Sequence, residues 1–216
     1  MPGRGRLLQK LPPSARHPSE REPVTAFLIS LAVIFVAELG DKSQLMAMTF
    51  ATRFRALPVL IGITAATALV HLASVALGAA LGAALPTGPI SILAGVAFLG
   101  FALWTLRGDE LDDTERDKAR RATGSAILAV GGAFFLAELG DKTMLATVTL
   151  AADNGGLLAL TGVWAGSTIG MVAADGLAIV VGQILGRRLP ERVIKYGAAA
   201  GFAIFGVLLL IEGATA

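Results

Sequence analysis

The fold of this 216-residue chain is decided by residues 24–50, which read VTAFLISLAVIFVAELGDKSQLMAMTF. The stretch exceeds the roughly 20 apolar residues that a helix needs to cross a bilayer, yet Glu38, Asp41 and Lys42 interrupt it. Ionisable side chains inside a membrane span are costly, so they mark functional sites. We therefore expect a transmembrane segment whose charged side chains face other helices rather than lipid.

The composition extends this interpretation to the whole chain. Hydrophobic residues make up 55% of the sequence and charged residues 16%, whereas soluble domains are about 25% charged. The mean hydropathy is +0.72. Six segments are long enough to span a membrane, which predicts an all-α polytopic membrane protein with six transmembrane helices. They are residues 24–50, 57–85, 90–106, 123–151, 157–185 and 194–211.

The chain repeats itself after 100 residues. The sequence AELGDK occurs at 37–42 and again at 137–142, within a longer match that starts at Phe35 and Phe135. Weaker matches continue through the following spans, so the repeats comprise residues 24–106 and 123–216. Three crossings are an odd number, and the second copy must therefore enter the membrane from the opposite face. This predicts two inverted three-helix repeats, a plan in which transporters bind substrate between the copies at mid-membrane.

The charges between the spans predict the orientation. The three connections that would share one side hold eleven Lys or Arg, whereas the opposite loops, 86–89 and 153–156, hold none. The positive-inside rule then puts both termini outside the cell (plasma or inner) membrane, although three basic residues in the N-terminal tail argue the other way. We expect residues 1–23 to be a disordered tail and residues 107–122 a charged cytoplasmic linker.

The two motifs can build a cation site. Glu38 and Asp41 are three residues apart and so share a helix face, as do Glu138 and Asp141. Four carboxylates converging from two helices would supply the oxygen ligands that hard divalent cations prefer. Neutral oxygen ligands could come from Ser43, Gln44 and Thr143.

Charge balance suggests how such a site could work. Each motif carries one net negative charge when it is fully ionised, so one divalent cation or two protons would neutralise the pair. Crowded carboxylates in a low dielectric hold protons more readily, which lets protons compete with metal. We expect other polar residues of the spans to act in proton movement or gating, or else in structural ion pairs and hydrogen bonds. These are Lys42, Lys142, Asp175 and His71.

The doubled motif resembles that of the Gdt family of calcium/manganese:proton antiporters. It reads Glu-Leu-Gly-Asp-Lys-Ser at 38–43 and Glu-Leu-Gly-Asp-Lys-Thr at 138–143. The resemblance extends over all six spans and implies manganese export, or exchange of calcium or manganese for protons, with the motif acids as metal ligands. It also implies that the N-terminus lies outside. The second copy departs from the first, because Met144 stands where the first has Gln44.

Other functional classes fit the sequence less well. A Ca²⁺/H⁺ antiporter on the same site is the first alternative. A small amino-acid exporter would need cationic groups for a carboxylate, and an intramembrane hydrolase would need a nucleophile with its base. The predicted spans have no arginine and the chain has no cysteine. We therefore expect a transporter rather than an enzyme, with no resident cofactor and no nucleic-acid partner; whether it forms a homodimer stays open.

Overall fold

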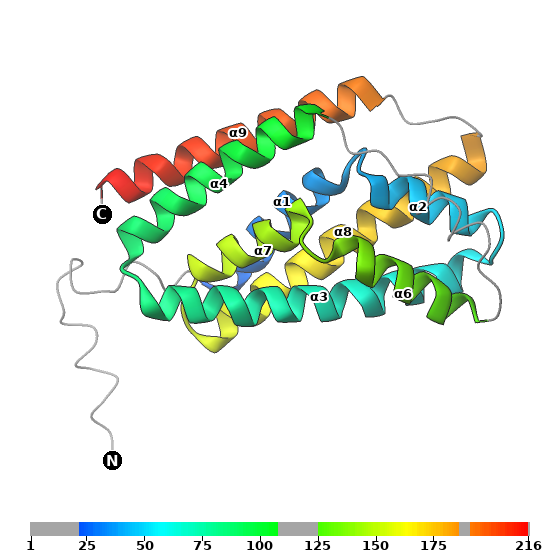
Figure 1. Ribbon diagram of the computed structural model, residues 1–216, viewed down its shortest axis with the longest axis horizontal. Helices are drawn as coiled ribbons and strands as arrows, with labels where there is room; N and C mark the ends of the chain where they lie inside the picture. Colours follow the sequence, from blue (N-terminus) through cyan, green and yellow to red (C-terminus); the bar gives the residue numbers. More distant parts are fainter. Residues whose placement is uncertain (1–21, 108–124, 186–190, 216) are drawn as a thin grey trace, which may run out of the picture.

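The computed structural model describes residues 22–107, 125–185 and 191–215, and the regular secondary structure within these ranges is all helical. Residues 1–21 of the predicted N-terminal tail and 108–122 of the predicted linker lie outside them, whereas Pro23, which was predicted to belong to the tail, starts the first helix. Eight helices are described in these ranges (Figure 1). They are α1 (Pro23–Glu38), α2 (Lys42–Ala51), α3 (Ala56–Ala84), α4 (Thr87–Arg107), α6 (Ala126–Glu138), α7 (Lys142–Ala152), α8 (Leu157–Leu185) and α9 (Glu191–Thr215).

Four of these helices agree with the predicted spans. Helices α3 and α8 have 29 residues each and coincide with the predicted segments to within one residue at either end. Helices α4 and α9 extend beyond the predicted segments at both ends. These four helices are long and apolar enough to cross a membrane, and α1 with α2 would make a fifth span if the two are taken together.

The prediction that residues 24–50 and 123–151 form one segment each is wrong at the centre of both. Helix α1 ends at Glu38 and α2 starts at Lys42, with a bend of 75° between them. Helix α6 likewise ends at Glu138, and α7 starts at Lys142. The apolar composition runs through both breaks, so span length alone could not reveal them.

The helices of the two halves pack on one another. Helix α1 lies along α8, whereas α6 lies along α3; α2 also contacts α8, and α7 contacts α3. Helices α4 and α9 run side by side as a separate pair (Figure 1). Phe98 of α4 packs against the rings of Phe202 and Phe205 of α9.

Small residues allow the closest of these approaches. Gly162, Gly166 and Gly170 lie one turn apart on α8 and face the backbone of α1. A Cβ atom on any of them would come closer than 3.0 Å to a carbonyl oxygen of α1. These three glycines of α8 therefore serve helix packing, as small residues commonly do in membrane bundles.

Candidate metal centre

Each motif folds into a tight turn that separates two half-helices. Gly40 has φ +76° and Gly140 has φ +80°, a left-handed conformation that glycine adopts without steric cost. The amide of Asp41 donates to the carbonyl of Glu38 at 3.0 Å, and Asp141 repeats this bond at 3.2 Å. The helix ends consequently fall inside the bundle. Carbonyl-bearing helix C-termini and unwound backbone of this kind favour cations.

A side chain four residues further on fixes each turn. The amide of Gly40 donates to Oε1 of Gln44 at 2.8 Å, and the amide of Gly140 donates to the sulfur of Met144 at 3.1 Å. Gln44 also donates from Nε2 to the carbonyl of Ala174 at 2.9 Å. The sequence predicts Gln44 as a candidate ligand but gives no direct sign of this supporting role. One indirect sign was present in the sequence: Gln44 and Met144, two chemically different acceptors, each follow a motif glycine by four residues.

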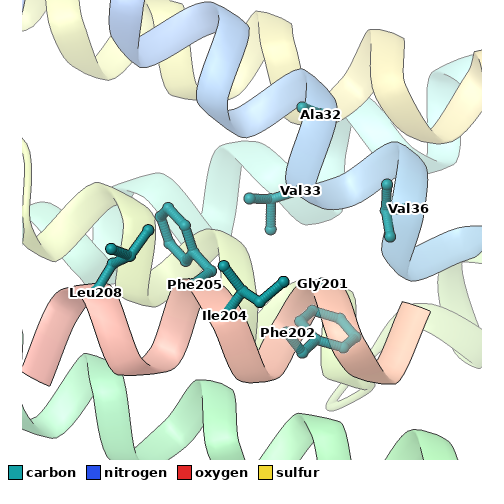
Figure 2. A pocket seen from close by; sticks show the side chains of 8 residues that line it. All are labelled: Ala32, Val33, Val36, Gly201, Phe202, Ile204, Phe205 and Leu208. Atoms are coloured by element: carbon teal, nitrogen blue, oxygen red, sulfur yellow. The ribbon is translucent and has the colours of Figure 1, made fainter. Parts of the chain in front are cut away.

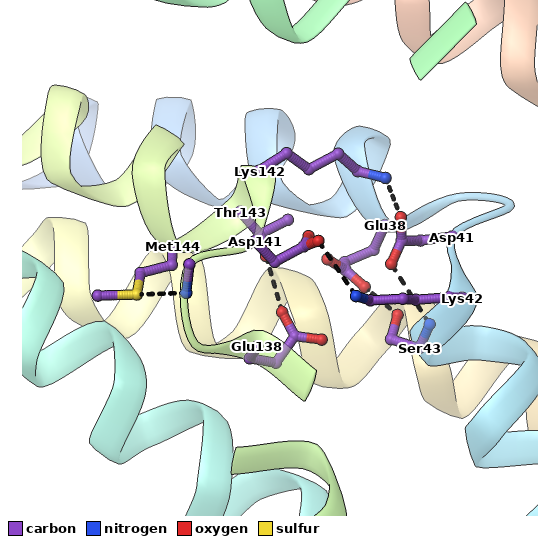
Figure 3. Close-up of polar contacts among 10 residues, drawn as sticks. Glu38, Asp41, Lys42, Ser43, Glu138, Asp141, Lys142, Thr143 and Met144 are labelled. Atoms are coloured by element: carbon purple, nitrogen blue, oxygen red, sulfur yellow. Dashed lines mark hydrogen bonds and ion pairs between the residues drawn. The ribbon is translucent and has the colours of Figure 1, made fainter. Parts of the chain in front are cut away.

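Three carboxylates meet between the two turns. One oxygen each from Glu38, Asp41 and Glu138 lies within 4.8 Å of the others, and all three residues are buried. Two oxygens on opposite sides of one bound ion are roughly 4–5 Å apart, so this spacing fits a single divalent cation. Figure 3 shows the side chains of the two motifs pointing toward one another. Asp141 lies beside this group of three but is not part of it.

The hydroxyl groups predicted as ligands serve the glutamates. Ser43 donates from Oγ to Oε2 of Glu38, and Thr143 donates from Oγ1 to Oε2 of Glu138 at 2.9 Å. The other oxygen, Oε1, of each glutamate is buried and has no hydrogen-bond partner in the part of the chain that the structure describes. The hydroxyls therefore hold one oxygen of each glutamate and leave its neighbour available to a ligand.

Both lysines form ion pairs that cross from one half of the chain to the other. Lys142 contacts Oδ1 of Asp41, and both side chains are buried. Lys42 lies 3.6 Å from Oδ1 of Asp141, and its side chain keeps 16% of its surface exposed. Figure 3 shows both pairs. Two reciprocal ion pairs thus link the motifs. In each pair a lysine of one motif neutralises the aspartate of the other, while the two glutamates lie close together.

Asp175 and His71 lie on the two long helices. Asp175 is buried on α8, next to Ala174, whose carbonyl accepts from Gln44. His71 on α3 lies 3.3 Å from Oγ1 of Thr168 through its Nδ1. Thr168 itself donates to the carbonyl of Trp164, so its oxygen can accept a hydrogen bond from the protonated Nδ1 of the histidine. This bond links α3 to α8 and suits the structural interpretation of His71.

An apolar pocket of about 220 Å³ lies between α1 and α9 (Figure 2). Its lining consists of Ala32, Val33, Val36, Gly201, Phe202, Ile204, Phe205 and Leu208. None of these side chains offers an oxygen ligand. Cation chemistry in the described residues therefore belongs to the enclosed carboxylates and not to this pocket.

The left-handed turn gives a testable stability difference. We expect Gly140→Ala to lower the free energy of unfolding by about 1–2 kcal/mol, because a Cβ atom is disfavoured at positive φ although nothing lies within 4 Å of it. Gly132→Ala is the matched control, since Gly132 is helical and equally uncrowded. It should raise stability by roughly 0.5–1 kcal/mol. Thermal unfolding in detergent measures both, and equal shifts would contradict the assignment of the turn.

Comparison with known proteins agrees with this geometry. Residues 26–113 and 126–216 match the family model described as "Divalent cation/proton antiporter GDT1". A Vibrio cholerae protein named "Putative manganese exporter" is 33% identical over 202 residues, which cover 93% of this chain and 95% of that protein. GDT1-like protein sll0615 of Synechocystis is 30% identical and covered over 96% of its length.

The similarity also includes a plant protein whose name refers to the chloroplast. Protein PAM71, chloroplastic, of Arabidopsis thaliana is 28% identical over 87% of this chain and 57% of its own length. No solved structure matches the chain. Because the family match covers both halves of the chain and both copies of the acidic motif, the chain belongs to the GDT1 family of divalent cation/proton antiporters.

Proposed function

We propose that the chain exports Mn²⁺ in exchange for protons, and that the metal binds between the two motifs. The observation that carries this proposal is the buried group of Glu38, Asp41 and Glu138, which joins acids of both halves around a space suited to one ion. A buried cluster of like charges is unfavourable unless a cation or protons neutralise it. The site is therefore expected to alternate between a metal-bound and a protonated state.

The lysines are proposed to substitute for the metal when it is absent. Lys142 contacts Asp41, one of the three proposed ligands. A divalent ion that engaged Asp41 would compete with the ammonium group for the same oxygen. Departure of Lys142 from Asp41 would then accompany metal entry, which couples binding to movement of α7 against the α1–α2 turn.

We further propose six spans arranged as two inverted repeats, residues 24–106 and 123–216. The exchanged packing of α1 on α8 and of α6 on α3 supports this, because a two-fold axis between the halves would produce it. The equivalent breaks after Glu38 and Glu138 support it as well. On this plan α1 with α2 and α6 with α7 each count as one span, and both termini lie outside the cytoplasmic membrane.

Calcium is the second candidate substrate. Carboxylate and hydroxyl oxygens suit Mn²⁺ and Ca²⁺ alike, and the 4.8 Å spread of the three ligand oxygens accommodates either ion. The name of the Vibrio cholerae relative, which refers to manganese export, favours manganese. A comparison of Mn²⁺ flux with Ca²⁺ flux separates the two candidates.

Reconstitution into liposomes tests the exchange. We expect an imposed proton gradient to drive Mn²⁺ across the bilayer. Conversely, Mn²⁺ that enters the lumen should move protons out and raise the luminal pH, and Mn²⁺ that leaves the lumen should lower it. A protonophore should abolish gradient-driven accumulation, and protein-free liposomes are the control. Metal flux that is unaffected by the proton gradient would contradict exchange, whereas Ca²⁺ flux exceeding Mn²⁺ flux would favour the second candidate.

A further inference from the structure

We propose that Asp175 of α8 is a further metal-binding carboxylate, and that it makes the cation site asymmetric. The inference rests on the proposed binding of metal between the motifs and adds a ligand from a helix that carries neither motif. Asp175 lies within α8 (Leu157–Leu185), well away from the ends of the helix. It is fully buried.

The carboxylate of Asp175 has both oxygens available. Neither Oδ1 nor Oδ2 has a hydrogen-bond partner among the residues that the structure describes. Glu38 and Glu138 each receive a hydroxyl bond at one oxygen. A buried carboxylate without any donor is destabilising by several kcal/mol, and intramembrane acids normally face a partner or an ion path. A bound cation would supply what the described surroundings of Asp175 lack.

Its position puts the carboxylate beside the cluster. Gln44, which fixes the first turn, reaches α8 and donates to the carbonyl of Ala174, the residue before Asp175. The carboxylate interacts electrostatically with Glu38 of one half and Glu138 of the other. Asp175 is therefore close to the point where the two motifs meet, on the wall formed by α8.

Asp175 has no acidic counterpart in the first repeat, so it is not part of the symmetry that relates the two motifs. A shift of 100 residues aligns Asp175 with Val75 of α3, which is buried and apolar. Asp175 brings the carboxylates of α8 and the two motifs to five, against two motif lysines, although only Glu38, Asp41 and Glu138 form the close group. Three net negative charges then remain when all are ionised. Such an excess favours a divalent over a monovalent cation, and a fourth anionic ligand from α8 completes more of the oxygen shell that hard cations require.

A purely structural role makes a different prediction. If Asp175 served only to hydrogen-bond a neighbouring helix, Asp175→Asn would preserve the contact because asparagine has the same size and both donates and accepts. If it binds metal, the same change removes an anionic ligand. The substitution thus separates the two roles without altering the volume of the side chain.

Binding of Mn²⁺ to the purified full chain in lipid nanodiscs, followed by the electron paramagnetic resonance of free Mn²⁺, is the test. We expect Asp175→Asn to raise the Kd by about 10- to 100-fold, the range typical when a group supporting a metal site is lost. Glu212→Gln removes one charge from an exposed position on α9 and should leave the Kd unchanged. Glu38→Gln reports on the cluster itself.

The outcomes separate the two proposals. Wild-type protein that binds no metal, or binds it equally well after Glu38→Gln, overturns the proposed function. Metal binding that is lost in Glu38→Gln and unchanged in Asp175→Asn overturns the role of Asp175 alone. If Asp175→Asn does not fold, labelling of wild-type carboxylates with a lipid-soluble carbodiimide replaces it. Mn²⁺ should protect both Glu38 and Asp175, and protection of Glu38 alone would overturn the inference.

Discussion

Glu38→Gln is expected to reduce Mn²⁺ transport by more than about 100-fold, beyond the range seen for outer-shell partners of metal sites. Glutamine keeps the size of the side chain and can still accept from Ser43, but it cannot supply the negative charge that a cation needs. Glu38 is fully buried and belongs to the group of three carboxylates. An acid on the protein surface therefore cannot take its place as a ligand. Export from cells under manganese stress and flux in liposomes both measure the effect.

The control for this variant is Glu22→Gln, which removes the same charge from an exposed residue at the start of α1. It should transport at the wild-type rate. Glu138→Gln should be as defective as Glu38→Gln, since the two glutamates have equivalent hydroxyl partners. Normal manganese resistance in cells producing a stable Glu38→Gln protein would remove Glu38 from the site.

Lys142→Gln is expected to destabilise the metal-free protein by about 3–5 kcal/mol, because it leaves the buried carboxylate of Asp41 without its cation. Added Mn²⁺ should recover much of this loss, since the metal can take the place of the ammonium group. The stabilisation by Mn²⁺ in thermal unfolding should therefore be larger in the variant than in the wild type. Transport should fall at the same time, because metal release would have no lysine to replace the departing ion.

Lys42→Gln provides the matched comparison. Its pair with Asp141 is longer, at 3.6 Å, and is partly exposed, so water screens the charge that remains. We expect a smaller loss of stability and a smaller response to Mn²⁺. Equal effects of the two substitutions would show that the lysines do not differ, and a Lys142→Gln protein insensitive to Mn²⁺ would contradict competition for Asp41.

Length and hydropathy predicted the long helices well. Helices α3 and α8 coincide with the predicted spans almost to the residue because their ends are set where apolar runs stop. Length and hydropathy did not predict the breaks at Gly40 and Gly140. They depend on a φ value and on hydrogen bonds from four residues away, and hydropathy carries no information on either.

The site was predictable in its residue types and less so in its contacts. The doubled motif indicated that acids of both halves would converge, and Glu38, Asp41 and Glu138 do so. The exchange of lysines could not be inferred, because each lysine follows directly after an aspartate of its own motif. Only the packing of the halves puts Lys142 on Asp41. The roles of Ser43 and Thr143 as donors to glutamate likewise depend on the turn.

The two turns are held by different side-chain acceptors, and this difference affects the equilibrium between the inward- and outward-facing forms. An amide oxygen accepts from Gly40, whereas a thioether accepts from Gly140 at a position otherwise equivalent. Sulfur is a weak acceptor, so the turn at Gly140 should open at a lower cost in free energy than the turn at Gly40. Each turn can act as a hinge between its two half-helices. In a carrier with identical halves, the inward- and outward-facing forms would be equally populated without gradients. A difference of about 1 kcal/mol between the hinges, the usual net worth of one hydrogen bond, would bias that equilibrium roughly five-fold toward one side of the membrane.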